Sequence, residues 1–109
     1  MAEERIMVTD GTLTLKCGRE ITIETIYDFK EQVELKSESP EVTTVIADLS
    51  EARFLDSSGI GFLVSLNSRL KSNNKNMYLL NPSEQICKTL ELVRLISFFS
   101  VIEDEREIP

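Results

Sequence analysis

The residues best suited to chemistry lie together in the middle of the chain. Asp56 precedes two hydroxyl side chains, Ser57 and Ser58, and Gly59 and Gly61 follow directly. A serine at the start of a helix meets free N–H groups and the positive end of the helix dipole, and both favour a phosphate group. Phosphorylation would add about −1.5 to −2 charges to a weakly charged stretch. The spacing therefore favours a serine switch at a helix N-terminus.

A purely structural interpretation of the same residues stays open. Asp56, Ser57 or Ser58 can accept a hydrogen bond from a free amide and cap the helix, while Gly59 and Gly61 let the helix pack closely. Glycine is about 1 kcal/mol worse than alanine inside a helix, so two glycines in a first turn need a reason. Close approach of another backbone is one such reason. Capping and switching remain alternatives at this point.

Enzyme chemistry is disfavoured by the composition. The 109 residues include no histidine, which excludes a Ser-His-Asp triad, a Cys-His pair and an ordinary zinc site. The run 59–61 begins like a dinucleotide-binding fingerprint, but Val64 stands where the third glycine is required. Cys17 and Cys87 do not form a secretory disulfide pattern and are predicted to be small buried apolar residues. We therefore expect no catalytic residue, no metal and no cofactor.

Charge and hydropathy narrow the class of partner. Lys and Arg number 12 against 19 Asp and Glu, so the formal net charge is −7. Nucleic acids and anionic membranes attract an excess of Lys and Arg, so neither is an expected partner. The sequence has no long apolar run, so no transmembrane span is predicted. We expect a protein of a reducing, cytoplasmic compartment.

Turn residues and β-branched runs predict the strands of the first half. Asp10-Gly11 is typical of a type I′ hairpin turn, whose two central residues need positive φ. The flanking runs 6–8 and 13–15 are predicted to pair as strands. The β-branched run 42–47 predicts a strand covered on both faces. A hairpin followed by a buried strand is the expected start of the fold.

Three helices are predicted. The first begins at an N-cap, Thr25, with Asp28 three residues later, and ends near Ser37. The second runs over about 57–71, directly from the serine pair. Asn81-Pro82 predicts an N-cap with proline at the first position of the third helix. The serine pair is therefore expected where a loop enters the second helix.

Short strands are predicted over 77–80 and 98–102, after the second and third helices. The resulting order, β-β-α-β-α-β-α-β, requires helix crossovers between parallel strands. We expect one α/β layer domain with a mixed, mostly parallel sheet. An N-terminal antiparallel hairpin and three to four helices complete the predicted fold.

The strand and loop over 45–50, followed by Phe54-Leu55-Asp56-Ser57-Ser58-Gly59-Ile60-Gly61, resemble the STAS-domain anti-sigma factor antagonists. The resemblance continues through 79–83 and 95–99, so it spans most of the chain. It implies a single STAS domain over 1–109. The core of that domain would cover about 5–102, and an acidic C-terminal end would cover 103–109.

The resemblance also implies a function. Family members are small cytoplasmic bacterial regulators without enzymatic activity. When unphosphorylated, such a protein binds an anti-sigma factor, which frees the sigma factor to direct transcription. The anti-sigma factor is itself an ATP-dependent serine kinase, and phosphorylation of the antagonist ends their binding. A phosphatase of the PP2C type removes the phosphate.

Residue by residue, the family's phosphorylated serine matches Ser58, and the neighbouring Ser57 is the second choice. Asp56 matches the acidic residue before the pair and is expected to shape the loop. The two glycines are expected to admit the kinase, and the apolar side chains beside them to add contact area. The predicted partner-binding residues are Asp56, Ser57, Ser58, Gly59, Ile60, Gly61 and Phe62.

One segment departs from the family pattern. Members usually have Gly-x-Leu/Ile-Asp before the first helix, whereas this chain has Gly18-Arg19-Glu20-Ile21-Thr22. An alternative function is a constitutive STAS interaction module of a transporter or signalling assembly, without a phosphate cycle. The retained serine pair, Ser57 and Ser58, favours the switched regulator over this alternative.

Overall fold

The sheet begins with the predicted β-hairpin. In the computed structural model, which describes residues 5–27 and 29–109, β1 (Ile6–Thr9) pairs antiparallel with β2 (Thr12–Lys16). The turn residues Asp10 and Gly11 have φ values of 51° and 81°, as a type I′ turn requires. The hairpin prediction is confirmed.

Three parallel strands extend this hairpin. They are β4 (Thr44–Asp48), β6 (Asn76–Leu80) and β7 (Val101–Ile102), and the sheet order is β1-β2-β4-β6-β7. A separate parallel pair is formed by β3 (Glu20–Ile21) and β5 (Phe54–Leu55). Because β5 leads directly into the serine pair, this small sheet fixes the position of the loop.

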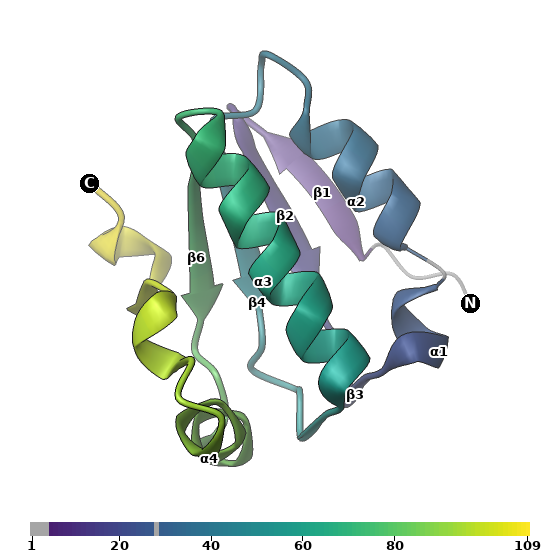
Figure 1. Ribbon diagram of the computed structural model, residues 1–109. Helices are drawn as coiled ribbons and strands as arrows, with labels where there is room; N and C mark the ends of the chain where they lie inside the picture. Colours follow the sequence, from purple (N-terminus) through teal and green to yellow (C-terminus); the bar gives the residue numbers. More distant parts are fainter. Residues whose placement is uncertain (1–4, 28) are drawn as a thin grey trace.

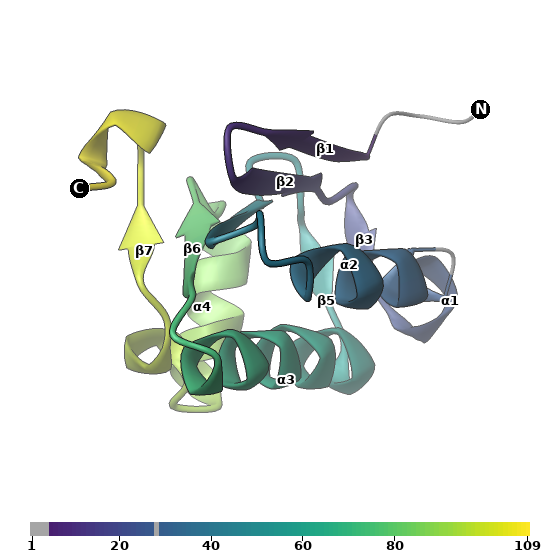
Figure 2. The same ribbon diagram turned by 90° about the horizontal axis from the view of Figure 1, so that it is seen from above.

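In the described part of the chain, four α-helices connect the strands. They are α1 (Ile23–Ile26), α2 (Lys30–Ser37), α3 (Ser57–Ser72) and α4 (Glu84–Leu92). Figures 1 and 2 show α2 and α3 side by side on one face of the five-stranded sheet. Short 3-10 turns, Ile96–Phe98 and Glu105–Glu107, flank β7. The mixed, mostly parallel α/β layer fold is as predicted.

The core fills the space between this sheet face and the helices. In β2, buried residues alternate with half-buried or exposed ones. In β4, the residues are buried along most of the strand. The fully buried side chains from the sheet and from α3 meet there. Central members are Leu13, Leu15, Val45, Ala47, Leu63 and Leu79. Burial of this apolar surface is the main force that stabilises the fold.

Polar contacts tie α2 to α3. Arg69 of α3 forms ion pairs with Glu34 and Glu38 on the α2 side. The Lys75 ammonium donates to the carbonyl oxygens of Ser37, at 2.7 Å, and Ser39, at 2.9 Å. The Ser37 carbonyl belongs to the last turn of α2, where carbonyls have no partner within the helix. These contacts hold the C-terminal halves of α2 and α3 together.

The predicted first helix is wrong in its start and its continuity. Thr22, not Thr25, is the N-cap, because its side chain accepts a bond from the Thr25 amide. Thr25 is the third helical residue and bonds back to the Thr22 amide at 2.9 Å, which completes a capping box. The segment then divides into α1 and α2. Asp28, which was expected to support the cap, lies outside the described residues.

Two further boundaries differ from the prediction. Ser83 caps α4 by accepting a bond from the Ile86 amide at 3.3 Å, whereas Asn81 lies before the helix with a φ of 50°. The Ser83 hydroxyl also donates to the Ala52 carbonyl at 2.6 Å, a contact with a distant loop that sequence periodicity does not reveal. The predicted strand over 98–102 is a 3-10 turn followed by only two strand residues.

Candidate functional site

Asp56 sets the first turn of α3. It is the N-cap residue in extended backbone conformation, and its Oδ1 atom accepts a hydrogen bond from the Gly59 amide at 2.8 Å. The Asp56 carbonyl accepts the first helical bond, from the Ile60 amide at 2.9 Å. Of the three residues considered as caps, the aspartate takes this role. The side chains of Ser57 and Ser58 are thus not used for capping.

The same carboxylate joins the starts of two helices. Its Oδ2 atom accepts a bond from the Ile23 amide, the first residue of α1, at 3.4 Å. The parallel pairing of β3 and β5 brings these two helix starts together, with Ile21 opposite Leu55. Asp56 therefore holds the N-termini of α1 and α3 at a fixed separation.

The two serines lie in the first turn of α3 with different surroundings. Ser57 is exposed, and Ser58 is half-buried. Ser58 faces a hollow between α3 and the α1–α2 segment, so its hydroxyl lies beside apolar side chains. It remains reachable from solvent at the positive end of a sixteen-residue helix. This is the geometry that a phosphate acceptor needs.

The two glycines of this turn have separate physical reasons. A Cβ atom on Gly59 would overlap the Ile21 carbonyl oxygen and would lie 2.8 Å from Leu55 Cδ1. Gly59 is therefore required for close packing of α3 on β3, inside the protein. A Cβ on Gly61 would meet no atom within 4 Å, and Gly61 is exposed. The structural interpretation thus holds for Gly59, while Gly61 leaves open space for another molecule.

The hollow beside Ser58, which we call the α1–α3 groove, has a volume of about 400 Å³. It lies between the α1–α2 segment and the N-terminal half of α3, which run beside one another in Figure 1. Its lining residues are Ile23, Ile26, Tyr27, Lys30, Ser58, Gly61, Phe62 and Ser65. Ile26 and Phe62 form an almost fully buried floor. Ile23 and Tyr27 are 62% and 84% exposed at its side.

The predicted partner-binding residues divide into surface and core. Ser57 and Gly61 are exposed, and Ile60 is half-buried against the core. Phe62 is only 4% exposed and packs edge-on against Phe29, with ring centroids 5.7 Å apart. Phe62 therefore belongs to the core and reaches the surface only as the groove floor.

The opposite wall of the groove was not predicted from the sequence. Ile23, Tyr27 and Lys30 belong to a segment that was predicted to begin its helix only at Thr25. Their spacing carried a usable signal. Together with Ile26 they follow the i, i+3, i+4, i+7 pattern of one helical face. In the structure, α1 contains Ile23 and Ile26, Tyr27 is its C-cap, and Lys30 begins α2.

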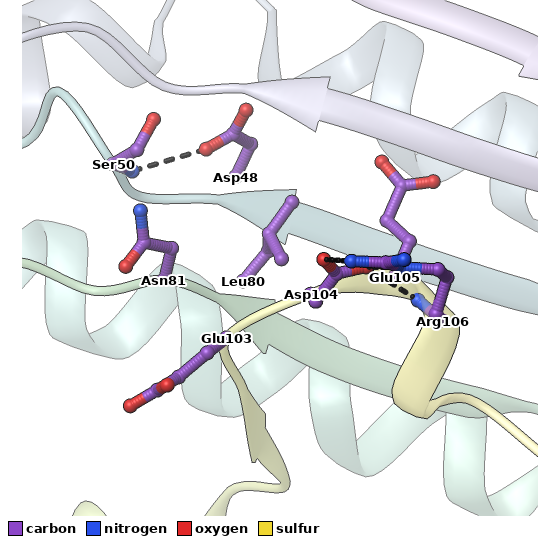
Figure 3. A pocket seen from close by; sticks show the side chains of 8 residues that line it. All are labelled: Asp48, Ser50, Leu80, Asn81, Glu103, Asp104, Glu105 and Arg106. Carbon is purple, nitrogen blue, oxygen red and sulfur yellow. Dashed lines mark hydrogen bonds and ion pairs between the residues drawn. The ribbon is translucent and has the colours of Figure 1, made fainter.

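A second hollow lies at the carboxyl ends of β4 and β6, where open α/β sheets commonly bind ligands. We call it the acidic hollow; its volume is about 510 Å³. Figure 3 shows the residues that line it: Asp48, Ser50, Leu80, Asn81, Glu103, Asp104, Glu105 and Arg106. Arg106 pairs with Asp104 at 2.8 Å, and its hydrogen bonds hold the pKa of the Asp104 carboxyl below its usual value. The remaining carboxylates leave the hollow unsuited to an anionic ligand.

The cysteines supply no reactive thiolate. Burial raises the pKa of the Cys17 thiol to about 12, and the nearby Asp48 carboxylate adds to the effect. Burial also raises the pKa of Cys87, with the Glu91 carboxylate as the next cause. Both cysteines are free. Neither thiol has the lowered pKa that marks a nucleophile.

Within residues 5–27 and 29–109, no three His, Cys, Asp or Glu residues are grouped in a way that could hold a metal ion. None of the helices in this part of the chain has the length and apolar character needed to cross a membrane.

Known proteins share both the sequence pattern and the fold. A family model described as STAS domain matches residues 5–108. The anti-sigma-B factor antagonist of Staphylococcus epidermidis is 28% identical over 95 residues, 86% of each chain. The structure of the anti-sigma factor antagonist SpoIIAA in its unphosphorylated form has a TM-score of 0.77 at 24% identity, covering 94% of this chain and 89% of that one. The Bacillus cell fate determinant SpoIIAA in the phosphorylated form has a TM-score of 0.72 at 24% identity, with coverages of 94% and 92%.

Proposed function

The chain belongs to the STAS domain family, and we propose that it is an anti-sigma factor antagonist switched by phosphorylation of Ser58. In its unphosphorylated form it binds an anti-sigma factor and so releases the sigma factor. The printed name of the Staphylococcus epidermidis relative, an anti-sigma-B factor antagonist, supports this class of partner. The protein acts by binding, not by catalysis.

The observation that carries this proposal is the position of Ser58. Its hydroxyl lies in the first turn of α3, half-buried at the edge of the α1–α3 groove. Asp56 holds that turn by capping it, so Ser58 is presented without being needed for the fold. A hydroxyl in this place can be modified while the helix and sheet remain intact.

The charge of a phosphate explains how binding would end. A phosphoserine carries about −1.5 to −2 charges, and the helix N-terminus stabilises it in solvent. In a partner complex the same dianion would be pressed against the apolar side chains of Ile23 and Phe62, which line the groove with Ser58. Burying a charge without a paired cation is strongly unfavourable. Phosphorylation would therefore weaken the complex and leave the free protein stable.

The remaining parts of the cycle follow from the same proposal. The anti-sigma factor is the serine kinase, ATP is its phosphate donor, and a PP2C-type phosphatase restores the hydroxyl. The setting is the cytoplasm. The phosphorylated and unphosphorylated forms named for SpoIIAA support a cycle of this kind in a protein of the same fold.

Phosphate transfer tests the site directly. The purified protein, its Ser58→Ala variant and its Ser57→Ala variant are incubated with ATP and the anti-sigma factor encoded in the same genome. Intact mass spectrometry should show one added phosphate on wild type and Ser57→Ala, and none on Ser58→Ala. Labelling of Ser58→Ala at the wild-type level would contradict the assignment. Tight binding without any labelling would instead favour a constitutive interaction module.

A further inference from the structure

The strand β1 (Ile6–Thr9) is an edge of the five-stranded sheet and has one open side. Among the described residues it pairs with β2 alone, and Figure 2 shows it at the rim of the molecule. β1 contains no charged residue and no proline, and its register with β2 is continuous, without a bulge. Charges, prolines and bulges usually protect an edge strand from pairing with another chain. The other edge strand, β7, is only two residues long and leads into the charged run 103–107, so it has the protection that β1 lacks.

The backbone of β1 directs the N–H and C=O groups of two residues to its open side. The Lys16 amide donates to the Arg5 carbonyl at 2.8 Å, so Arg5 is at a position that is hydrogen-bonded to the neighbouring strand. Hydrogen-bonded and non-hydrogen-bonded positions alternate along an antiparallel pair. Ile6 and Val8 are therefore not bonded to β2, and their backbone groups face outward. Unpaired groups of this kind are a template for a further strand.

Apolar side chains accompany these backbone groups on both faces of β1. Met7 is 56% exposed and Val8 is 46% exposed. Val8 lies opposite the core residue Leu13, so Val8 and Ile6 lie on the face of the sheet that the helices cover. Met7, which pairs with Thr14, lies on the other face. A strand added at this edge would cover apolar surface on both faces at once.

We propose that β1 pairs antiparallel with β1 of a second copy of this chain, around a two-fold axis at Met7. In this register Ile6 of each copy lies opposite Val8 of the other, and each of these two pairs exchanges both of its N–H···O=C bonds. The two Met7 side chains meet at the axis in a non-hydrogen-bonded pair, with Cα atoms about 4.5 Å apart. The two five-stranded sheets thereby become one continuous sheet.

The symmetry of β1 is the argument for a second copy as its occupant. The register centred on Met7 satisfies the outward groups of both Ile6 and Val8. Within Ile6–Thr9, an axis at Ile6 or at Val8 would use the groups of only one of these two residues. The register at Met7 also places apolar side chains opposite apolar side chains on both faces, and β1 carries no charge that opposes it. A two-fold interface of this kind closes on itself and does not lead to longer aggregates.

The expected dimer is weak. Four residues of each copy are far fewer than the roughly 20–30 residues a side of a standard stable interface. Each copy also carries a net charge of −7, which repels the other copy. We therefore expect a dissociation constant on the order of 100 µM, and tighter pairing at higher salt, because screening weakens that repulsion.

Sedimentation equilibrium tests the pairing. The weight-average mass of wild type should rise from that of a monomer toward that of a dimer between about 10 µM and about 1 mM. Met7→Lys places two ammonium groups opposite each other at the axis and should stay monomeric over this range. Leu35→Lys is the matched control: Leu35 is 63% exposed on α2, so the same change from apolar to cationic is made away from β1. It should associate as wild type does.

Opposite charges at the axis test the register. Met7→Glu should also be monomeric alone, because two carboxylates then face each other. An equimolar mixture of Met7→Lys and Met7→Glu should form a heterodimer, since each ammonium then faces a carboxylate. Met7 is more than half exposed, so both variants should keep the wild-type midpoint of urea unfolding.

Amide hydrogen exchange tests the pairing on wild type, without a variant. The Ile6 and Val8 amides should exchange about fourfold more slowly at about 1 mM than at about 20 µM, as mass action with this dissociation constant requires. The Met7 and Thr9 amides alternate with them and point to β2, so their exchange should change less. Equal slowing of all four amides would contradict the proposed direction of the free backbone groups.

The other outcomes are equally decisive. Wild type that stays monomeric at about 1 mM would overturn the proposal and would leave an extended segment of a different protein as the occupant of this edge. Equal association of wild type and Met7→Lys, or equal losses in Met7→Lys and Leu35→Lys, would place the contact elsewhere. A mixture of Met7→Lys and Met7→Glu that stays monomeric would exclude the two-fold register. The pairing uses neither Ser58 nor any other residue of the α1–α3 groove, so it goes beyond the proposed function, and either can fail without the other.

Discussion

The first turn of α3 and the carboxyl ends of β4 and β6 both present carboxylates beside a hollow, but they use them differently. At α3, Asp56 binds two backbone amides, those of Gly59 and Ile23, and the hollow beside it is largely apolar. At the carboxyl ends of β4 and β6, Asp48 accepts one hydrogen bond from the Ser50 amide, at 3.0 Å, and the hollow beside it is acidic.

This difference indicates which of the two hollows is better suited to a partner. The carboxyl ends of β4 and β6 have the usual topological position for ligands in open α/β folds. The carboxylates there nevertheless repel phosphate. The first turns of α3 combine the half-buried hydroxyl of Ser58 with an apolar groove, and among the described residues that line this groove Lys30 is the one cation. The chemistry of the lining, more than the position in the topology, is the reason that we propose the first turn of α3 as the partner site.

The largest expected effect is a difference in the free energy of unfolding between variants of the two glycines in the first turns of α3. Gly59→Ala should lower the free energy of unfolding by about 3 kcal/mol, because its Cβ has no room beside Ile21 and Leu55. Gly61→Ala should raise it by up to about 1 kcal/mol, the gain in helix propensity. Urea unfolding followed by circular dichroism measures both. Similar values for the two variants would remove the distinction between packing and open space.

The next effect compares the two aspartates. Asp56→Ala removes the cap of α3 and the bond to Ile23, and should cost about 1–2 kcal/mol of unfolding free energy. Asp48→Ala removes one bond and should cost less than about 1 kcal/mol. Asp56→Asn is the control, since asparagine caps helices as well as aspartate does. An Asp48→Ala loss equal to that of Asp56→Ala would show that the α3 turn is not specially held.

The smallest effect concerns Cys17, whose buried thiol lies near Asp48. Its pKa is raised from 9.0 to about 12 in the folded protein. Above pH 9 the unfolded chain therefore loses this proton first, so stability falls as pH rises toward 12. At pH 10 this loss is about 1 kcal/mol. Reduced Cys17→Ala should lose less stability than wild type between pH 8 and pH 10.

Cys87→Ala provides the comparison for that experiment. Cys87 is only half-buried, so its removal should leave most of the alkaline loss of stability in place. If Cys17→Ala and wild type lose stability equally between the two pH values, the burial of the Cys17 thiol does not govern this behaviour.

Local signals were enough to predict much of the fold. Asp10-Gly11 predicted the hairpin because positive φ at two successive residues has few other causes. The predicted start of α3 at about residue 57 is confirmed, and Asp56, one of three candidate caps, caps it through an amide three residues away. The second helix was predicted to end near residue 71, and α3 ends at Ser72, with Asn74 at a φ of 61° just beyond it. Each of these features depends on neighbours in the sequence.

The errors arose where distant contacts decide. The start of α1 is joined to Asp56 across 33 residues, and Ser83 caps α4 while it also bonds to Ala52 across 31 residues. Phe62 could not be assigned to the core before Phe29 was known to pack against it. The opposite wall of the groove was missed for the same reason. Sequence periodicity identifies the apolar face of a helix but not the element against which that face packs.

The most direct test of the switch compares one affinity in two covalent states. Isothermal titration calorimetry would measure binding of the anti-sigma factor to the unphosphorylated protein and to protein phosphorylated on Ser58. We expect at least about a hundredfold weaker binding after phosphorylation, which corresponds to roughly 2.7 kcal/mol. Dissociation constants that agree within about twofold would contradict the account, because Ser58 would then carry no signal to the partner.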